Sequence, residues 1–431
     1  MMLDALPPGP RFTLPQKIAY ARDPIGFIAR CRDRFGPTFT MRNMIGTVVM
    51  TTDPEAAREI LSAPRQTYGV STVKLLSPLL GKNSLILTEG SQHLKGRKQL
   101  MPHFNGAALA THRARICRIA AEEAEAVRHC QVQMQDVMQS VSLRIIVETI
   151  FGATEPERAH ALITAVKGRI AASNPLLVFM PALRQSAFGF SPWDRFRAAS
   201  RRLEKLLLSE IIHHRTACCD GGSFLAGLVT DSTMNDREIC DQLGTLLLAG
   251  HDTTASATSW AFDWLQREPA LLGTIKDSLH DSGDGEEALM GNALLEEVCL
   301  ETLRLSPVIP DIVRYLKEPL RLGGKTLPAG INIGICTTLI QRDPTLFDDP
   351  LIFRPARWRG KPADPHTFLP FGGGSRKCIG AAFALQEMQL ILGTFLSRLT
   401  IKAQKPEAVS PTAVRNHFTM GPKGGVPVLT A

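Results

Sequence analysis

The sequence of 431 residues predicts a mainly α-helical fold with small β-sheets, an α+β architecture. Two observations carry this prediction: apolar residues recur at helical spacing along most of the chain, and short runs rich in β-branched residues interrupt them. A third observation concerns domain organisation. No linker rich in proline, glycine or serine and no internal repeat divides the sequence, so we expect one domain over residues 1–431.

The individual elements follow from apolar spacing and from breaks at proline, glycine and polar clusters. Residues 35–52 are rich in β-branched residues and predict a hairpin. Further strands are expected at 312–316, at 320–336 and near the C-terminus. Helices are expected near 53–62, 91–101, 107–130, 135–151, 192–217, 235–267, 288–305 and 379–397.

Composition places the chain among ordinary globular proteins. Its 44% hydrophobic and 21% charged residues exclude a disordered tail or a fibrous protein. Nine cysteines without any C-x-x-C pair make neither a disulfide framework nor a zinc ribbon, which favours a reducing, cytoplasmic compartment. The net charge of +8 favours acidic partners, but aromatic residues make up only 6% and do not interleave with the cations, so we expect no nucleic acid.

Two segments bear on membrane attachment. The N-terminus carries four prolines by residue 15 and no apolar signal core. The most apolar long stretch, 240–265, contains His251, Asp252 and several threonines, which are costly in lipid, so a buried helix is expected there. The sequence therefore predicts a soluble protein without a membrane anchor.

A glycine-rich loop, residues 371–380 (FGGGSRKCIG), delivers Cys378 to the first turn of the apolar helix expected after it. Backbone N–H groups and the cations Arg376 and Lys377 would stabilise negative charge on sulfur, so the pattern predicts a thiolate. Inert packing in the core suits cysteines such as Cys117 and Cys240, but it would not need an electropositive loop.

The spacing F-x-x-G-x-R-x-C-x-G, which begins at Phe371, resembles the haem-ligand signature of the cytochrome P-450 superfamily. The resemblance extends over nearly the whole chain. It implies a single-domain cytochrome P-450 fold, with haem b held between the long I helix and the cysteine loop with the L helix that follows. Cys378 would be the iron ligand, and Phe371, Ala249 and Gly250 would contact the haem.

Glu301 and Arg304 lie three residues apart on an expected helix, so their side chains meet on one face. Taken alone, such a pair is usually solvated at the surface. A buried pair would need a third group, for which Arg357 is the candidate. These residues resemble the E-x-x-R of the family's K helix and the later arginine of its Glu-Arg-Arg cluster, which implies a structural role behind the haem.

The run Ala249-Gly250-His251-Asp252-Thr253-Thr254 resembles the oxygen-binding groove of the family's I helix. An interior glycine costs about 1 kcal/mol against alanine, so something should approach the backbone closely there. A threonine can bond back to a carbonyl one turn earlier and open the helix for water. The resemblance implies that Thr253 holds bound oxygen and that Asp252 passes protons, both catalytic roles. The alternative is a packing glycine with internally satisfied threonines, and for His251 a packing role is expected.

Haem carries two propionates, which call for several cations from separate segments. The family positions for them are occupied by His93 and Arg97, one turn apart on the helix expected after Gly90, and by Arg314 and Arg376. His93 stands where many relatives have tryptophan. Each of these residues, taken alone, could be an ordinary surface cation.

Together the motifs imply a haem-thiolate monooxygenase that inserts one oxygen atom of O2 into a lipophilic small molecule, by hydroxylation or epoxidation. The family positions that imply the substrate walls are mostly apolar: Val73 to Leu80, Leu176 to Phe179, Ala249, Ile309, Ile312, Phe418 and Thr419. The alternatives are a peroxide-using or rearranging enzyme on the same fold and a haem-based sensor. The Asp252-Thr253 pair favours the monooxygenase.

Electrons are expected from a ferredoxin or flavodoxin with its NAD(P)H-dependent reductase, because the chain has no flavin or iron–sulfur segment. Residues 90–121 contain no acid, and six cations of this stretch make a candidate docking face for such an acidic carrier: Lys95, Arg97, Lys98, Arg113, Arg115 and Arg118. Arg359, Lys361 and Lys377 lie near the cysteine segment. The alternative is a solvated charged face. We expect the protein to be a monomer.

Overall fold

The computed structural model describes residues 6–152, 155–173, 177, 183–187, 189–216, 223–283, 285–403, 413–416 and 419–431. The chain divides into two compact units. Unit 1 comprises Met1–Ser71, Ala120–Met138 and Thr253–Ala431, and unit 2 comprises Thr72–Ile119 and Gln139–Asp252. The fold is mainly helical with small sheets, as predicted. The single domain expected over residues 1–431 stays a prediction.

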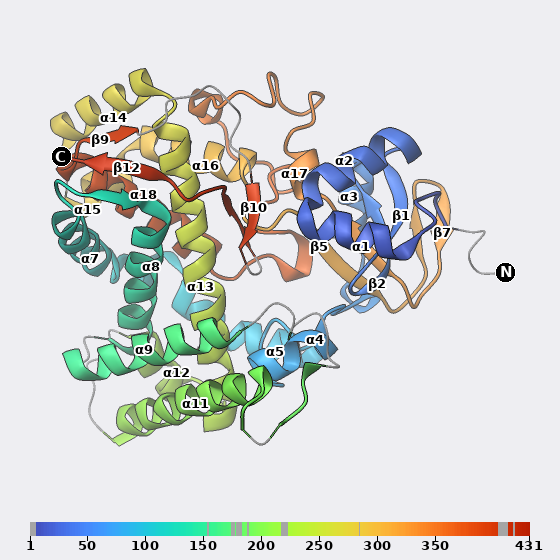
Figure 1. Cartoon of the computed structure of the whole chain (residues 1–431), viewed down its shortest axis with the longest axis horizontal. Helices are drawn as coiled ribbons and strands as arrows, with labels where there is room; N and C mark the ends of the chain where they lie inside the picture. The colour runs from blue at the N-terminus through green and yellow to red at the C-terminus, as the bar shows by residue number, and fades with distance from the viewer. Residues whose placement is uncertain are drawn as a thin grey trace. The chain divides into compact units, whose positions relative to one another are not determined.

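Among the described residues of unit 1, a mixed sheet of five strands packs between helices (Figure 1). Its strands, in spatial order, are β1 (Thr38–Asn43), β2 (Gly46–Thr51), β8 (Asn332–Ile335), β5 (Ile312–Leu316) and β3 (Tyr68–Gly69). Neighbours are antiparallel except β2 and β8, in which Val49 lies opposite Ile333. Alternate residues of β2 point to opposite faces. Val49 packs with α3 (Pro54–Ser62), whereas Val48 and Met50 pack with α2 (Pro24–Phe35). The hairpin predicted at 35–52 is confirmed.

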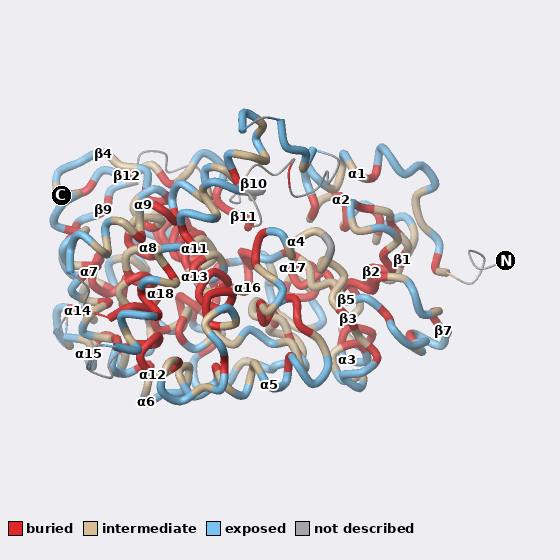
Figure 2. Tube along the Cα trace, turned by 90° about the horizontal axis from the view of Figure 1, so that it is seen from below, coloured by how far each residue is buried: buried red, intermediate tan, exposed pale blue. Residues whose placement is uncertain are grey.

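Further helices and smaller sheets complete unit 1. The helix α18 packs against α14, α15 and α16, and its residues 386–396 are all buried. Figure 2 shows buried residues gathered along α16 and α18. The remaining helices are α1 (Thr13–Arg22), α14 (Pro269–Ser282), α15 (Glu286–Gly291), α16 (Ala293–Leu305), α17 (Thr337–Ile340) and α18 (Ala381–Arg398). The remaining strands are β4 (Gln131–Gln133), β6 (Leu320–Leu322), β7 (Lys325–Leu327), β9 (Ile401–Ala403), β10 (Ala413–Asn416), β11 (Thr419–Pro422) and β12 (Pro427–Thr430).

Unit 2 is built from helices. In it α9 packs along α11, and the ion pair between Arg158 of α9 and Glu210 of α11 joins them at 2.5 Å. The helix α12 packs against both α11 and α5. The helices of this unit are α4 (Val73–Leu80), α5 (Gly90–Leu100), α6 (Gly106–Ala110), α9 (Pro156–Ala172), α11 (Pro192–Thr216) and α12 (Phe224–Asp231).

The chain passes between the units once at Ser71–Thr72 and three times within helices, which are α7 (Arg113–Ala126), α8 (Met134–Phe151) and α13 (Asp236–Leu265). The 30-residue helix α13 is about 45 Å long at 1.5 Å per residue. It begins with a capping box, in which the Asn235 side chain accepts from the Glu238 N–H and the Glu238 carboxylate accepts from the Asn235 N–H. The helix expected at 235–267 is therefore confirmed.

Three predictions of a continuous helix or strand are wrong, because the structure divides each segment into shorter elements. The helix expected at 107–130 is divided into α6 and α7 at Thr111, whose hydroxyl donates to the carbonyl of Ala108, and it ends at residue 126. The helix expected at 288–305 is interrupted at Asn292, whose side chain accepts the N–H of Leu295 and caps α16. The strand expected at 320–336 consists of β6, β7 and β8, because Gly323 and Gly324 both have positive φ and turn β6 back along β7.

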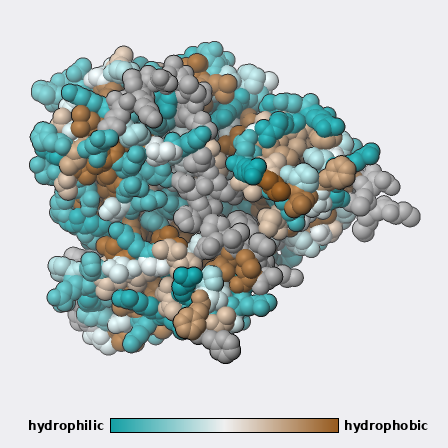
Figure 3. Space-filling model, in the orientation of Figure 1, coloured by the Kyte–Doolittle hydropathy of each residue, from teal (hydrophilic) through white to brown (hydrophobic). Residues whose placement is uncertain are grey.

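The molecular surface in Figure 3 is largely hydrophilic, with apolar residues in small groups. Within the described ranges, no helix combines the length and the apolar character that a membrane crossing requires.

Candidate haem-thiolate site

The cysteine loop of unit 1 closes on itself before α18 begins. The Cys378 N–H donates to the carbonyl of Phe371 at 2.9 Å, and the Cys378 residue is exposed. The sequence pattern predicted Cys378 in the first turn of this helix. Helix α18 begins at Ala381, so that prediction is wrong and Cys378 lies three residues before the helix. Because its N–H closes the loop, Cys378 is fixed by the loop rather than by the helix.

The three consecutive glycines of this loop, Gly372 to Gly374, are required for different physical reasons. Gly372 and Gly374 have φ of 68° and 63°, a region that residues with a Cβ adopt at a cost. A Cβ at Gly374 would lie 2.5 Å from the carbonyl oxygen of Leu61, and a Cβ at Gly373 would lie 2.9 Å from the Leu61 side chain. Leu61 belongs to α3, so two of the glycines allow the end of this helix to pack directly on the loop. The sequence pattern had indicated only that these glycines help to stabilise the thiolate.

Two predicted propionate cations interact within unit 1. Arg314 lies on β5, and burial together with the charge of Arg376 lowers the pKa of Arg314 to about 10, while Tyr68 acts in the opposite direction. Arg314 makes only a long 3.4 Å contact to the carbonyl of Val313, and no carboxylate pairs with it among the described residues. Two guanidinium groups that repel each other in a partly buried place call for an anion. A haem propionate fits this requirement, as the exposed thiol of Cys378 fits haem iron.

The other two predicted propionate residues lie on α5 in unit 2. His93 is buried and Arg97 is half-buried, four residues apart and hence on one face of the helix. The expected helix at 91–101 is confirmed, while the contact of both residues with haem stays a prediction.

Helix α13 continues without a break through residues 249–254. Ala249 is exposed, whereas a Cβ at Gly250 would lie 3.0 Å from the Cδ1 of Ile146 on α8, so the close approach expected at this glycine comes from a packed side chain. His251 is buried, and its Nδ1 donates to the carbonyl of Leu247 at 3.2 Å, in agreement with the expected packing role. Burial lowers the pKa of His251, against the opposing charge of Asp252. Asp252 is half-buried, as is Thr253 after it.

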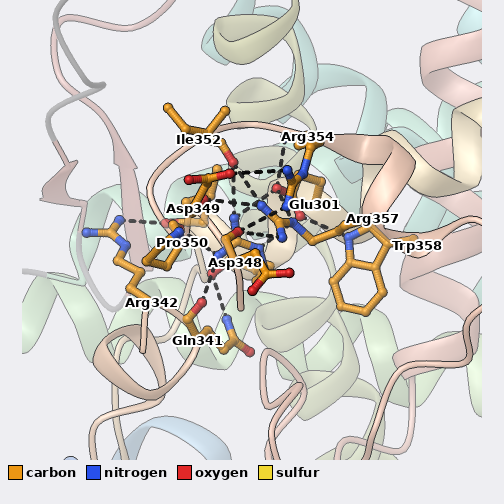
Figure 4. Close-up of polar contacts among 12 residues, drawn as sticks. Glu301, Gln341, Arg342, Asp348, Asp349, Pro350, Ile352, Arg354, Arg357 and Trp358 are labelled. Carbon is orange, nitrogen blue, oxygen red and sulfur yellow. Dashed lines mark hydrogen bonds and ion pairs between the residues drawn. The ribbon is translucent and has the colours of Figure 1, made fainter. Parts of the chain in front are cut away.

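The predicted cluster of Glu301, Arg304 and Arg357 forms at the end of α16, and Figure 4 labels Glu301 and Arg357. Glu301 and Arg304 have 0% side-chain exposure, so the solvated surface pair is excluded. Arg304 donates from Nε and Nη2 to the two Glu301 oxygens at 2.9 and 2.8 Å, and Arg357 donates from Nε at 2.9 Å. Burial by itself raises the pKa of Glu301, but the hydrogen bonds and charge of Arg304, together with the hydrogen bonds from Arg354 and Arg357, outweigh it, so the pKa lies below its usual value.

A comparison with family models decides the family. The model of the family described as "Cytochrome P450" matches residues 5–427. The chain belongs to the cytochrome P450 family. Members are in general haem-thiolate monooxygenases, oxidoreductases that use haem iron and dioxygen, bind hydrophobic substrates and need redox partners.

Individual relatives agree with this assignment. Cytochrome P450 135B1 of Mycobacterium tuberculosis is 32% identical over 434 residues, which cover 97% of this chain and 90% of that protein. Cytochrome P450 135A1 of the same organism is 33% identical over 437 residues, covering 97% and 94%. Among solved structures, the cytochrome P450DA heme domain matches with a TM-score of 0.85 at 20% identity, over 99% of this chain and 97% of that one, and supports the fold.

The residues expected to line the substrate pocket of this cytochrome P450 lie on several segments. Ile312 is half-buried, with its Cδ1 3.7 Å from the position of a Cβ at Gly372, so it lies beside the cysteine loop. Ile309 is 39% exposed, and Val73 is half-buried at the start of α4. Three further predicted positions, Leu176, Phe179 and Phe418, lie outside the described residues.

Several partners of the Glu301 cluster were not predicted from the sequence. The indole of Trp358 and the backbone N–H of Arg354 each donate to Glu301 at 2.9 Å (Figure 4). The buried amide of Gln341 donates to the carbonyls of Leu303 and Arg304 and accepts the N–H of Leu369. The position of Trp358 directly after Arg357 is a usable signal, whereas nothing in the sequence points to Gln341.

The exposed basic surface of this cytochrome P450 includes fewer of the cations of residues 90–121 than the sequence predicted. Arg118 of α7 forms an ion pair with Glu148 of α8, which also binds Arg144, so the charge of Arg118 is largely compensated. On α5 and the residue directly after it, an exposed stripe remains that we call the α5 stripe, made of Leu94, Lys95, Lys98 and Met101. Near the cysteine segment, Arg359 pairs with Glu297 at 3.2 Å, while Lys361 and Lys377 line a cavity of about 520 Å³ beside α16.

Proposed function

We propose that this cytochrome P450 hydroxylates or epoxidises a lipophilic small molecule, with haem b bound through the thiolate of Cys378. The observation that carries the proposal is the loop of Phe371–Gly380, which leaves the Cys378 residue exposed beside a positively charged strand and loop. An inert structural cysteine would be buried and would not need neighbouring cations.

Several residues of this chain would hold the haem. Cys378 binds the iron, while Arg314, Arg376, His93 and Arg97 bind the propionates through charge-assisted hydrogen bonds. Apolar contacts to the ring come from Phe371, Ala249 and Gly250. When bound, the haem supplies dioxygen binding and oxygen-atom transfer, and thiolate ligation favours cleavage of the O–O bond.

Asp252 and Thr253 supply protons in this proposal. Both are half-buried, so they can contact ordered water and still be held in place by α13. With haem and dioxygen bound, the hydroxyl of Thr253 would donate a hydrogen bond into the site, and the carboxylate of Asp252 would relay protons there through water. A peroxide-using or rearranging enzyme, or a sensor, has no need of this pair.

Electrons come from an acidic ferredoxin or flavodoxin with its NAD(P)H-dependent reductase, and the α5 stripe is the docking surface. Its exposed residues are two lysines, Lys95 and Lys98, and two apolar residues, Leu94 at 50% and Met101 at 43% exposure. Positive charge steers an acidic partner, and apolar contacts hold it. A monomer in the cytoplasm is part of the same proposal.

The test of the proposal is the ligand of the iron. The reduced protein with bound carbon monoxide should absorb at the long wavelength typical of a thiolate ligand, and Cys378→His should shift the band to the imidazole type. Cys240→Ser, which changes a buried cysteine on α13, is the matched control and should keep the thiolate band. A thiolate band that survives in Cys378→His would contradict the assignment.

A further inference from the structure

The first helix of unit 1 has its polar and apolar sides reversed. Of the ten residues of α1, Gln16 alone is buried, whereas Leu14 and Ile18 are 67% and 46% exposed. Phe12, directly before the helix, is 77% exposed. Leu14 and Ile18 lie four residues apart and therefore share one side of α1. A surface helix normally turns its apolar side to the core of its own protein, so packing within unit 1 does not explain these side chains.

Polar contacts on the other side of α1 fix its orientation on β1 (Figure 1). The side-chain oxygen of Gln16 accepts the N–H of Arg42 on β1 at 2.8 Å. Tyr20, four residues after Gln16, donates from its hydroxyl to the carboxylate of Asp311 at 2.5 Å. Successive residues of a helix are about 100° apart, so the apolar pair lies on the side opposite these two. A rotation of α1 that buried the apolar pair would therefore break both polar contacts.

Cations lie next to the apolar side chains and have no acidic partner. Arg11, Lys17 and Arg22 form no ion pair and no side-chain hydrogen bond with any residue that the structure describes. At about 100° per residue, Lys17 and Arg22 lie on either side of the apolar pair. Residues 6–22 contain no acid, and the next carboxylate, Asp23, caps α2 and pairs with an arginine of that helix. The positive charge beside the apolar pair is therefore uncompensated.

The combination of exposed apolar side chains with unpaired cations matches a lipid surface that carries negative charge. Apolar side chains enter the boundary between headgroups and acyl chains, and lysine and arginine bind the anionic headgroups. Phe12 and Leu14 are exposed on most of their surface, so a partner must surround them. A fluid bilayer surrounds them without a preformed pocket, whereas an acidic protein would need a hollow of matching shape.

We propose that the outer side of α1 binds the surface of an anionic lipid bilayer. We call this surface the α1 face, and it consists of Phe12, Leu14, Ile18, Arg11, Lys17 and Arg22. The contact is reversible and superficial, since only side chains of the α1 face enter the lipid. The inference concerns a surface of unit 1 and does not depend on the reaction proposed at Cys378.

The experiment measures the binding of the haem-loaded, full-length protein to lipid vesicles, as the fraction that floats with them in a density gradient. The probes are vesicles of phosphatidylglycerol, which is anionic, and vesicles of phosphatidylcholine, which has no net charge. We expect tighter binding to the anionic vesicles. Added salt should weaken this binding, because it screens the attraction between the cations and the headgroups.

Two double variants test the apolar and the charged part of the α1 face separately. Leu14→Ser with Ile18→Ser should weaken binding to anionic vesicles about 10- to 100-fold, because these side chains would no longer be buried in lipid. Lys17→Gln with Arg22→Gln should weaken it about 10- to 30-fold at low salt, since each cation near an anionic surface contributes about fivefold. Both variants replace side chains without partners, so their melting temperatures should equal that of the wild type.

Two matched controls replace the same kinds of side chain elsewhere. Leu351→Ser with Ile352→Ser changes two apolar residues that are also strongly exposed. Lys167→Gln with Arg201→Gln removes one exposed lysine from α9 and one exposed arginine from α11. Both controls should bind anionic vesicles as the wild type does.

The proposal is overturned if the wild type binds neither kind of vesicle, or binds both equally. It is also overturned if the controls weaken binding as much as the variants of the α1 face. If the charge variant loses binding while Leu14→Ser with Ile18→Ser binds like the wild type, the α1 face attracts negative charge in general. That result would favour an acidic protein as the partner and would overturn the lipid proposal.

Discussion

Glu301→Gln should destabilise the protein far more than the same substitution one turn earlier on α16. The Glu301 carboxylate accepts hydrogen bonds from the side chains of Arg304, Arg357 and Trp358 and from the backbone N–H of Arg354. Glutamine has the same size, but it has one acceptor oxygen and presents an NH2 group to donors on the other side. Two buried guanidinium groups would then lose their only carboxylate within this cluster.

The expected magnitude follows from burial. Removing one partner of a buried ion pair costs about 3–5 kcal/mol, because a desolvated charge is left uncompensated. At position 297, the carboxylate of Glu297 binds Arg359, whose side chain is 71% exposed, so Glu297→Gln should cost about 1 kcal/mol or less. The free energy of unfolding of typical proteins is about 5–15 kcal/mol, so of these two substitutions only Glu301→Gln should remove a large fraction of the stability.

The assay is urea unfolding followed by far-UV circular dichroism, with both variants and the wild type at neutral pH. A second measurement is the free energy of unfolding as a function of pH in the acid range. The pKa of Glu301 is lowered by folding, so its stabilisation is present above the usual carboxylate pKa of about 4.3 and is lost as the pH falls through the folded value. The difference in the free energy of unfolding between the wild type and Glu301→Gln should therefore decrease as the pH falls. Equal unfolding midpoints for the two variants at neutral pH would refute the reasoning.

Three other predictions concern the loop, the proton donors and the docking surface. Gly374→Ala should destabilise the protein more than Gly372→Ala. Both residues have positive φ, but only at position 374 would the Cβ lie 2.5 Å from a backbone oxygen of α3. Equal decreases in melting temperature for the two variants would show that this contact is unimportant. Thr253→Ala should leave haem content and substrate affinity nearly unchanged while lowering the ratio of product formed to NAD(P)H consumed, and an unchanged ratio would contradict the proton-delivery role. Lys98→Glu should slow the reduction of the protein by an acidic ferredoxin at low salt, and the effect should become smaller as added salt screens the charges. The control Lys167→Glu on α9 should not change the rate of reduction. Equal reduction rates for Lys98→Glu and the wild type would exclude α5 as the docking surface.

The parts of the fold that could be predicted are those in which local sequence decides the structure. The hairpin at 35–52 and the long helix α13 have strong periodicity, and the capping pair of Asn235 and Glu238 defines where α13 begins. The helices α2, α9 and α14 were not predicted. Each begins with a proline, which is compatible with the first turn of a helix but does not by itself distinguish a helix from a loop.

The candidate site shows the same division. The cluster of Glu301, Arg304 and Arg357 could be predicted, because its residue types and spacing carry the chemistry, whereas the role of Cys378 as iron ligand stays a prediction. The contact of Gly374 with α3 could not be predicted, since a glycine in a motif does not reveal which distant backbone approaches it. The compensation of Arg118 by Glu148, thirty residues away, is likewise a tertiary contact, and it removes from the docking surface a cation that the sequence had placed there.

The guanidinium groups around Glu301 also determine when a nearby coil can become ordered. Arg304 donates to the carbonyls of Gln341, Pro350 and Ile352, which lie 37, 46 and 48 residues further along the chain. In a β-sheet these oxygens would be bonded by an adjacent strand, but here side chains of a helix take that place. We expect the coil to acquire its native path only after α16 has formed and its charges are paired, so this stretch should be among the last parts of unit 1 to assemble during folding.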